Sequence, residues 1–347
     1  MKSLLASAVI ATGLSFATLA PSPAWAQSST NAQIEALNEM VAWTQASAQI
    51  QTDLMSLFSA DMMGEMYAVL NAGDMDEIAR FGQRFEAQRQ AVLTRAEQQM
   101  NALPKPERWN IDPSLFSRQE SATYRAALGQ YNSMQETYDE YAKMSGGMSD
   151  MFINLETMDE DALLQLQQVQ VRSSIRMIEI ENRQIDGYLI AIEPENPNHQ
   201  FQKVVKQFNI ATIPEIEWSA EANTDLATRQ SYGREMRDAL LPIGPLIRQG
   251  RANMVRQIAD LEAAGRGALS PADAELLPKV IRLYESFEET FDIEEKILTS
   301  SMSSARLYLS DESDDAISAR IDENDLAFFA LLEDRARIFD ARLSMLE

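Results

Sequence analysis

Apolar residues recur every seven positions in the middle of this chain, and this spacing constrains the fold more than any other feature. Val171, Ile178, Ile185 and Ile192 stand seven apart, and a second set lies three residues before each of the last three. A period of 3.5 residues places both sets on one side of an α-helix, as in a coiled coil. Asn182 belongs to the second set, and an Asn at such a position fixes the register of packing. The spacing predicts a long helix that packs against a neighbour.

Most of the chain after residue 30 shows the same helical spacing. Glycine and proline are sparse, at 13 and 12 of 347 residues, which favours long helices. The apolar seams are Ile34, Leu37, Val41, Ala48, Met55, Phe58, Met62 and Val69; Ile78, Phe81, Phe85, Val92 and Ala96; Leu277, Tyr284, Phe287, Phe291 and Leu298; and Phe328, Leu332, Phe339 and Leu346. We therefore predict an all-α fold, an elongated antiparallel helical bundle with coiled-coil-like seams and seven or eight helices.

Capping residues predict where the helices begin and end. A first helix should run without interruption to Asn71–Gly73, and Asp74, with Glu77 three residues on, should start the next one, which ends before Pro104. The other predicted starts combine a Ser or Thr with an acid, a proline or both. They are Ser117 with Glu120, Thr157 with Glu160, Ser270 with Pro271 and Asp273, and Ser310 or Ser313.

Helix-breaking stretches suggest a division of the chain. Glu193–Asn198 holds two prolines, and Asn209–Asn223 is expected to be irregular because it combines β-branched residues with a proline. We expect an N-terminal helical bundle over 27–195 and a C-terminal helical region over 196–347. The alternative is one continuous domain with a kinked connection. An ordered loop is expected over 108–117, and a break or kink is expected at Pro242 and Pro245.

The first 26 residues have the pattern of a secretory signal peptide. Lys2 is the only charged residue there, the apolar run Leu4–Ala20 is short for a membrane span, and two prolines follow it. Ala24-Trp-Ala26 is a small-x-small cleavage pattern, so we expect the cut between Ala26 and Gln27. A retained anchor is the alternative. No other stretch approaches 18 apolar residues, so the mature chain is expected to be exported and free of transmembrane segments, periplasmic or secreted.

The charge balance and the absence of cysteine narrow the function further. Without the first 26 residues the chain carries 53 acidic and 29 basic residues, a net charge of −24 with His neutral. Such a chain lacks the basic footprint that nucleic acids or anionic membranes require. With no cysteine it has no disulfide, no thiolate metal ligand and no cysteine nucleophile.

Several motifs that mark catalytic or metal sites are missing from the sequence. It has no GxSxG, SxxK, HExxH or EF-hand pattern, and His199, the single histidine, is interpreted as a solvated loop residue. Gly265 and Gly267 lack the third glycine of a dinucleotide loop and are interpreted as a helix end. We therefore predict no catalytic residue and no cofactor.

One short segment, Ile281–Phe287, resembles the "ES" helix of lytic transglycosylases, exported enzymes that act on peptidoglycan. The resemblance covers about seven residues and implies that Glu285 is the general acid. The family's glycine-rich segment does not follow. Glu285 instead shares a helix face with Glu288, Glu289 and Asp292, which predicts a solvated acidic face, with contact to a divalent cation or a basic partner as alternatives.

The methionine clusters and the regularly spaced tyrosines can each be interpreted in two ways. Thioethers at close spacing bind Cu(I) in exported proteins, but methionine also fills helix seams. The candidate copper ligands are Met62, Met63, Met66, Met144, Met148 and Met151. Tyr124, Tyr131 and Tyr138 recur every seven residues, which predicts the rim of a buried seam or, alternatively, an aromatic groove for a peptide or sugar.

These features favour an exported, non-catalytic helical scaffold or binding protein of the bacterial cell envelope that acts through protein–protein contacts. Three alternatives remain: a periplasmic chaperone-like protein, a peptidoglycan-active lytic enzyme using Glu285, and a methionine-based copper-handling protein. The sequence predicts a protein partner but neither its identity nor the oligomeric state.

Overall fold

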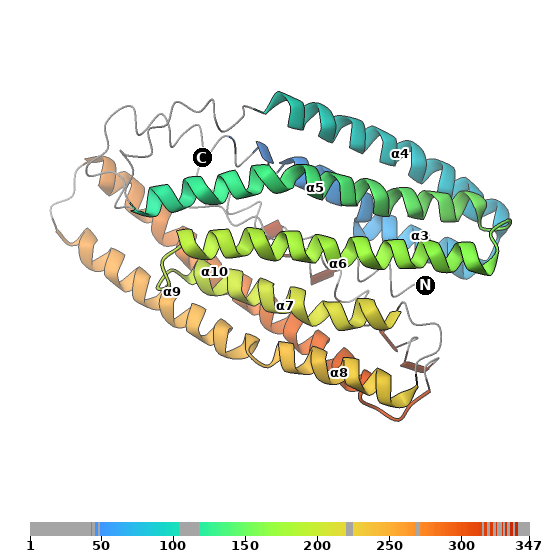
Figure 1. Ribbon diagram of the computed structural model, residues 1–347. Coiled ribbons are helices and arrows are strands. Elements are labelled where there is room, and N and C mark those ends of the chain that lie inside the picture. The colour runs from blue at the N-terminus through green and yellow to red at the C-terminus, as the bar shows by residue number, and fades with distance from the viewer. Residues whose placement is uncertain are drawn as a thin grey trace. The chain divides into compact units, whose positions relative to one another are not determined.

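The computed structural model describes residues 49–103, 118–219, 225–267 and 271–313, together with single residues at 43, 46 and 47 and between 316 and 338. Over this part of the chain the secondary structure is helical, without a strand, and the helices pack against one another (Figure 1). The predicted all-α helical bundle is confirmed. The predicted loop at 108–117 and the Ser117 and Ser270 caps lie outside the described residues.

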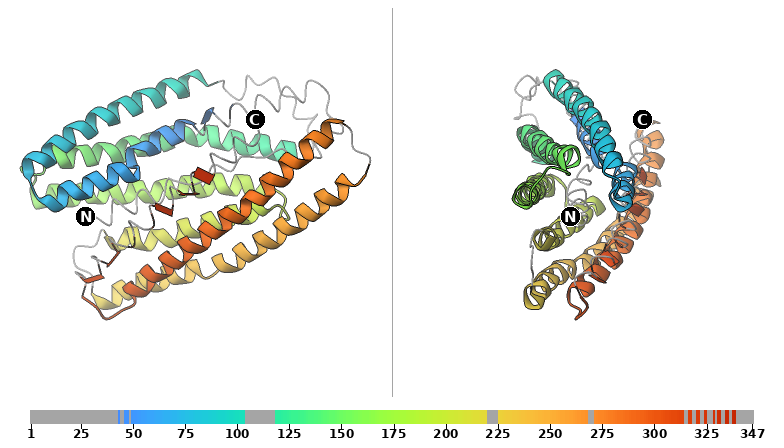
Figure 2. Two further views of the ribbon diagram at one scale, coloured as in Figure 1. Left: turned by 180° about the vertical axis from the view of Figure 1, so that it is seen from behind. Right: turned by 90° about the vertical axis from the view of Figure 1, so that its right-hand side faces the viewer.

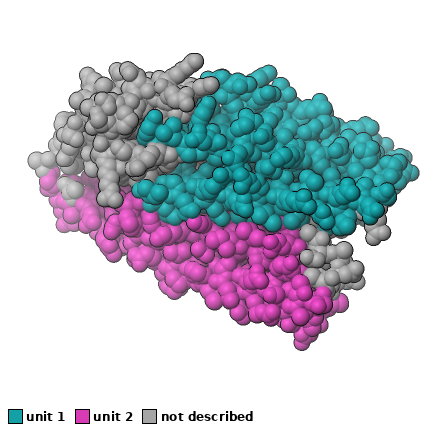
Figure 3. All heavy atoms as spheres, viewed as in Figure 1, with its two compact units in different colours: residues 1–191 teal, residues 192–347 magenta. Residues whose placement is uncertain are grey.

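The chain divides into two compact units, residues 1–191 and residues 192–347 (Figure 3). We call them unit 1 and unit 2 and describe each by itself. The domains expected at 27–195 and 196–347 stay a prediction, because compactness alone does not show that either part folds independently.

In the part of unit 1 that the structure describes, a helical stretch over 49–55 is followed by one short 3₁₀ helix and four α-helices. They are η2 (Ser56–Phe58), α3 (Ala60–Ala72), α4 (Met75–Ala102), α5 (Arg118–Asn154) and α6 (Glu160–Ala191). The long helix α5 packs against both α4 and α6 (Figure 1). The predicted seams face its interior, since Val171, Ile178 and Ile185 on α6 are buried, as is every predicted seam residue of α4.

Two of the predicted caps are confirmed at the junction of α3 and α4. Gly73 ends α3 in the left-handed conformation with φ of 67°, which glycine adopts without steric cost. The Asp74 carboxylate then accepts hydrogen bonds from the backbone N–H groups of Asp76 and Glu77, at 3.0 and 3.3 Å. These bonds satisfy donors that lack partners within the first turn.

Two other helix starts differ from the prediction. The first helix is not continuous, because Ser59 is extended and its hydroxyl accepts a hydrogen bond from the N–H of Met62, which starts α3. The start of α6 is capped by Asp159, whose carboxylate accepts from the N–H of Ala162 at 2.8 Å. Thr157 instead donates to the carbonyl of Asn154 and closes the end of α5.

Close helix packing in unit 1 depends on a glycine. A Cβ atom added to Gly82 of α4 would lie 2.7 Å from the Cβ of Phe152 on α5 and 3.1 Å from the backbone nitrogen of Ile153. Contacts that short are repulsive, so only glycine lets the two backbones approach this closely.

Among its described residues, unit 2 has four α-helices, and the single residues described between 316 and 338 are also helical. The helices are α7 (Pro197–Ser219), α8 (Leu226–Leu240), α9 (Ile243–Gly265) and α10 (Pro271–Tyr308). Helix α7 packs against α8 and α9, and α10 packs along α8 and α9 (Figure 2). The break predicted at Pro242 is confirmed, since α8 ends at Leu240 and α9 begins at Ile243.

Helix α7 corrects two predictions. The stretch from Asn209, expected to be irregular, is helical through Ser219 with Pro214 inside the helix. His199 is not a solvated loop residue: it lies in the first turn of α7 and is only 6% exposed. Burial lowers the pKa of its imidazole, which therefore favours the neutral form.

Candidate functional site

The predicted signal peptide and its cleavage site at Ala26 and Gln27 lie outside the described residues. Among the helices that the structure describes, none is both long and apolar enough to cross a membrane.

The two methionine clusters meet in the core of unit 1. Met63 and Met66 come from α3, and Met144, Met148 and Met151 come from α5; all five are at most 2% exposed. Met62 is half-buried against the same core. The thioether of Met144 accepts a hydrogen bond from the hydroxyl of Ser174 on α6, at 3.7 Å. These contacts are those of side chains that fill an irregular core.

The regularly spaced tyrosines border this core. Tyr124, Tyr131 and Tyr138 are half-buried and pack against it, and the ring of Tyr131 lies 6.0 Å from that of Trp43. This position matches the rim of a buried seam, one of the two interpretations of the spacing.

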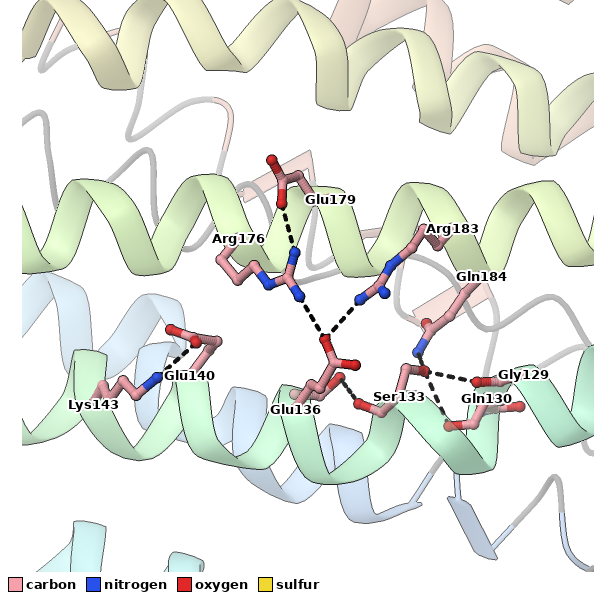
Figure 4. A network of polar contacts seen from close by, with 11 residues as sticks. Gly129, Gln130, Ser133, Glu136, Glu140, Lys143, Arg176, Glu179, Arg183 and Gln184 are labelled. Atoms are coloured by element: carbon pink, nitrogen blue, oxygen red, sulfur yellow. Dashed lines mark hydrogen bonds and ion pairs between the residues drawn. The ribbon is translucent and has the colours of Figure 1, made fainter.

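A buried hydrogen-bond network in unit 1 joins α5, α6 and the segment that contains Ser47. The Tyr188 hydroxyl of α6 donates to Oε1 of Gln130 on α5 at 2.8 Å, and Nε2 of Gln130 donates to the hydroxyl of Ser47 at 2.9 Å. On the next turn of α5, the Ser133 hydroxyl accepts from Nε2 of Gln184 at 2.7 Å (Figure 4). Each polar group therefore finds a partner, which fixes the register of α5 against α6.

One turn further along α5 a charged cluster lies at the surface. Glu136 of α5 accepts hydrogen bonds from Arg176 and Arg183 of α6, at 2.9 and 2.8 Å (Figure 4). The hydrogen bond from Arg183 is the main reason that the pKa of Glu136 is lowered. The side chains are about half exposed, so the cluster orients the helices more than it stabilises them.

In unit 2 the acidic face of α10 carries five carboxylates on about three turns. We use this name for Glu285, Glu288, Glu289, Asp292 and Glu295, all of which are exposed. Arg251 of α9 reaches across to three of them, with Nε 3.1 Å from Glu288 and Nη1 2.9 Å from Glu295, and it also pairs with Asp292. The sequence analysis predicted the other four residues of this face, but it included neither Glu295 nor Arg251.

Glu285 lies on this open face and not in a pocket. A glutamate that acts as a general acid sits in an apolar environment, and the side chain of Glu285 is exposed to solvent. The structure therefore gives the implied role of Glu285 no support.

The interior of unit 2 holds two carboxylates that the sequence analysis did not identify. Glu215 of α7 is 5% exposed and accepts a hydrogen bond from the Tyr308 hydroxyl of α10 at 3.2 Å. Burial raises its pKa to about 7, against the effect of that hydrogen bond. The Tyr308 ring packs edge-on against Trp218, with ring centroids 4.9 Å apart.

The second carboxylate, Glu294 of α10, forms a fully buried ion pair. Oε1 of Glu294 lies 3.0 Å from Nε of Arg335, and the two side chains are 0% and 1% exposed. The guanidinium carbon lies 5.2 Å from the ring centroid of Phe201 on α7, within cation–π range. Because both charges are sealed from solvent, they are poorly placed to meet a dissolved substrate.

Neither the described side chains nor the comparisons with known proteins identify a metal site or a family. Among the described residues there is no group of three or more His, Asp or Glu side chains that could hold a metal ion. No family model matches the chain, and the comparisons with curated proteins and with solved structures likewise found no match. The acidic face of α10 is exposed and carries an excess of negative charge, with five carboxylates beside Arg251, which pairs with three of them.

Proposed function

We propose that this chain is an exported, non-catalytic helical binding protein of the bacterial cell envelope, and that the acidic face of α10 contacts a basic partner protein. One observation carries the proposal: five carboxylates on one face of α10 are exposed, and three of them are brought together by one arginine, Arg251. The signal-peptide pattern of residues 1–26 supports the exported location.

Arg251 illustrates how a cation fits this face. Its guanidinium bonds Glu288, Asp292 and Glu295, which follow one another at steps of four and three residues along α10. A planar guanidinium with five N–H donors can serve several carboxylates at once. Glu285 and Glu289 extend the same face, so it can accept further arginine or lysine side chains from outside.

We expect the affinity for the partner to depend on the salt concentration and the association rate to be high. Individual exposed ion pairs contribute only about 0.2–1 kcal/mol, and complementary charge mainly raises the association rate and selects partners. Since exposed charges are screened by salt, binding should weaken as the ionic strength rises.

A charge-reversal experiment tests the proposal. The double variant Glu285→Lys/Glu289→Lys and the matched control Glu235→Lys/Glu262→Lys carry the same charge change, and the control residues are exposed on α8 and α9. Each tagged protein is expressed in its source cells and recovered from the envelope fraction with its bound proteins. We expect the α10 variant to lose about tenfold of one basic protein and the control to keep it. Equal recovery by both variants would refute a role for this face.

A further inference from the structure

Helices α9 and α10 run antiparallel, and their contacts fix which residues lie level with each other (Figure 2). A Cβ atom added to Gly250 would meet Phe291, whereas one added to Gly265, fifteen residues later, would meet Leu277, fourteen residues earlier. The ion pairs of Arg251 with the acidic face follow the same register. Each step forward along α9 therefore corresponds to a step back along α10.

A second arginine of α9 is level with the two carboxylates of the acidic face that Arg251 does not bind. Arg251 pairs with Asp292, and Arg256 stands five residues further along α9, level with the turn between Glu285 and Glu289. At about 100° per residue Arg256 is turned about 140° from Arg251 around the helix, so it points away from its own α10. It is exposed and forms no ion pair with a described residue, and the same holds for Glu285 and Glu289.

The next turn of α9 repeats this relation with the signs exchanged. Asp260 is level with residue 283 of α10, one residue after Arg282, and both side chains are exposed. Lys296, after the acidic face, has no acidic counterpart, because α9 has no acidic residue between 243 and 259. The two helices therefore present opposite charges side by side at two neighbouring levels.

The strip of α9 between these charges is apolar and open to solvent. Ala252, Val255 and Ala259 follow one another at steps of three and four residues, and all three are exposed, Val255 at 62%. Single exposed apolar residues are common, but this valine stands between two small side chains and beside the charges just described. Small side chains let a second helix approach closely.

We infer that a second copy of this chain docks on this face, with α9 of each copy lying on α10 of the other. A two-fold axis parallel to the helices joins the two faces and keeps the levels, so Arg256 of each copy meets Glu285 and Glu289 of the other. Asp260 meets Arg282 by the same rotation, and the apolar strip lies between the copies. A two-fold axis across the helices would instead lay α10 on α10 and bring like charges together. The parallel axis gives an antiparallel four-helix packing.

The second copy and the basic partner of the proposed function use the same carboxylates, so each excludes the other. A partner with a larger basic surface displaces the second copy, and the dimer is the form of the free protein. The inference rests on the proposed function only for this competition. Self-association is measured on the purified chain alone, so its failure is distinguishable from a failure of partner binding.

Sedimentation equilibrium of the purified full chain at low salt tests the inference. The native chain should be a dimer. Arg256→Glu should raise the dimer Kd at least about tenfold, because two symmetry-related contacts become repulsive, and Glu285→Arg/Glu289→Arg should do the same. The matched control Arg234→Glu, at an exposed position of α8, makes the same charge change as Arg256→Glu and should leave the Kd unchanged.

Mixing the two variants separates contact between copies from every effect within one copy. In a dimer of one Arg256→Glu chain and one Glu285→Arg/Glu289→Arg chain, each of these contacts pairs opposite charges, so the mixture should form a 1:1 dimer with a nearly native Kd. This rescue also shows that both variants are folded. The inference is overturned if the native chain sediments as a monomer or if Arg256→Glu and Arg234→Glu have the same Kd. It is also overturned if the mixture associates no better than either variant alone.

Discussion

Glu294 and Arg335 meet in the interior of unit 2, with 3.0 Å between Oε1 and Nε and with neither side chain more than 1% exposed. Arg251 makes the opposite arrangement on the outside of the same unit, where one guanidinium serves three exposed carboxylates. The interior pair costs free energy to bury, whereas the exterior cluster costs little to form because its side chains stay in contact with solvent.

The buried carboxylates predict that stability depends on pH. Burial raises the pKa of Glu215 from 4.5 to about 7, so the folded protein binds this proton more tightly than the unfolded chain. The contribution of this group to the free energy of unfolding should therefore be fully present below about pH 4.5 and be lost as the pH rises through about 7. By the same relation the loss amounts to at most about 3 kcal/mol.

The variant Glu215→Gln isolates this effect, because glutamine has nearly the same shape as glutamate and carries no charge at either pH. In urea unfolding at pH 5 and pH 8, the variant should be more stable than the native chain at pH 8 and nearly equal to it at pH 5. Glu285→Gln, at an exposed position of α10, serves as the control and should show no such difference. A Glu215→Gln variant with the native pH dependence would contradict the prediction.

Close packing of α9 against α10 predicts that any side chain at position 250 destabilises the protein. An added Cβ would lie 2.2 Å from a ring carbon of Phe291, which is fully buried. Gly250→Ala should therefore lower the free energy of unfolding by about 1–3 kcal/mol, as overpacking does. Gly129→Ala, where nothing lies within 4 Å, should instead raise it by about 0.5–1 kcal/mol. Thermal denaturation followed by circular dichroism compares the two.

The polar network of unit 1 predicts a specific cost for Tyr188→Phe. The change leaves Oε1 of the buried Gln130 without the hydroxyl that donates to it. We expect a loss of about 1–2 kcal/mol, the usual cost of an unsatisfied buried acceptor. Tyr131→Phe, at the half-buried rim, should cost less than about 0.5 kcal/mol. Equal losses in chemical denaturation would show that the hydroxyl of Tyr188 contributes nothing particular.

The pattern at residues 24–26 predicts processing during export. N-terminal sequencing of the mature protein should begin at Gln27. Ala26→Arg should block the cut because the cleavage pattern requires a small residue there, and the precursor should then accumulate. Recovery of Met1 on the native protein would contradict the signal-peptide interpretation.

Local rules explain the part of the fold that the sequence could predict. The seven-residue spacing in α6 and the junction of Gly73 with Asp74 depend on neighbours along the chain, and the structure has both as expected. Helix α7 differs because a proline inside a helix costs about 3 kcal/mol. Most of α7 is nevertheless buried, so its packing outweighs the cost of Pro214, an effect that no local pattern reveals.

The buried charges were missed although the sequence contains a signal for them. Glu294 stands three residues after Phe291 and four before Leu298, which is a seam position among apolar residues. Arg335 occupies the same kind of position, between Phe328 and Phe339. The burial of these two side chains could not be predicted, because acids and arginines are frequent in this chain and most of them are exposed. A charged residue at a seam position is expected to be buried only if its partner of opposite charge is known.

The acidic face could be predicted from spacing alone, but its cross-link to α9 could not. Residues at steps of three and four share a helix face whatever the fold, whereas Arg251 precedes Glu288 by 37 residues in the chain. Only the packing of α9 beside α10 brings the guanidinium to the carboxylates.

Site-specific photo-crosslinking from position 289 of α10 in intact source cells tests the central claim most directly. A benzophenone side chain replaces Glu289, and the same group at Glu235 of α8 is the control. We expect one dominant adduct from position 289, formed with a basic envelope protein, and no such adduct from position 235. When the cells are permeabilised and the salt concentration is raised, the yield of the adduct from position 289 should fall. Adducts of equal pattern from both positions, or none from position 289, would contradict the central claim.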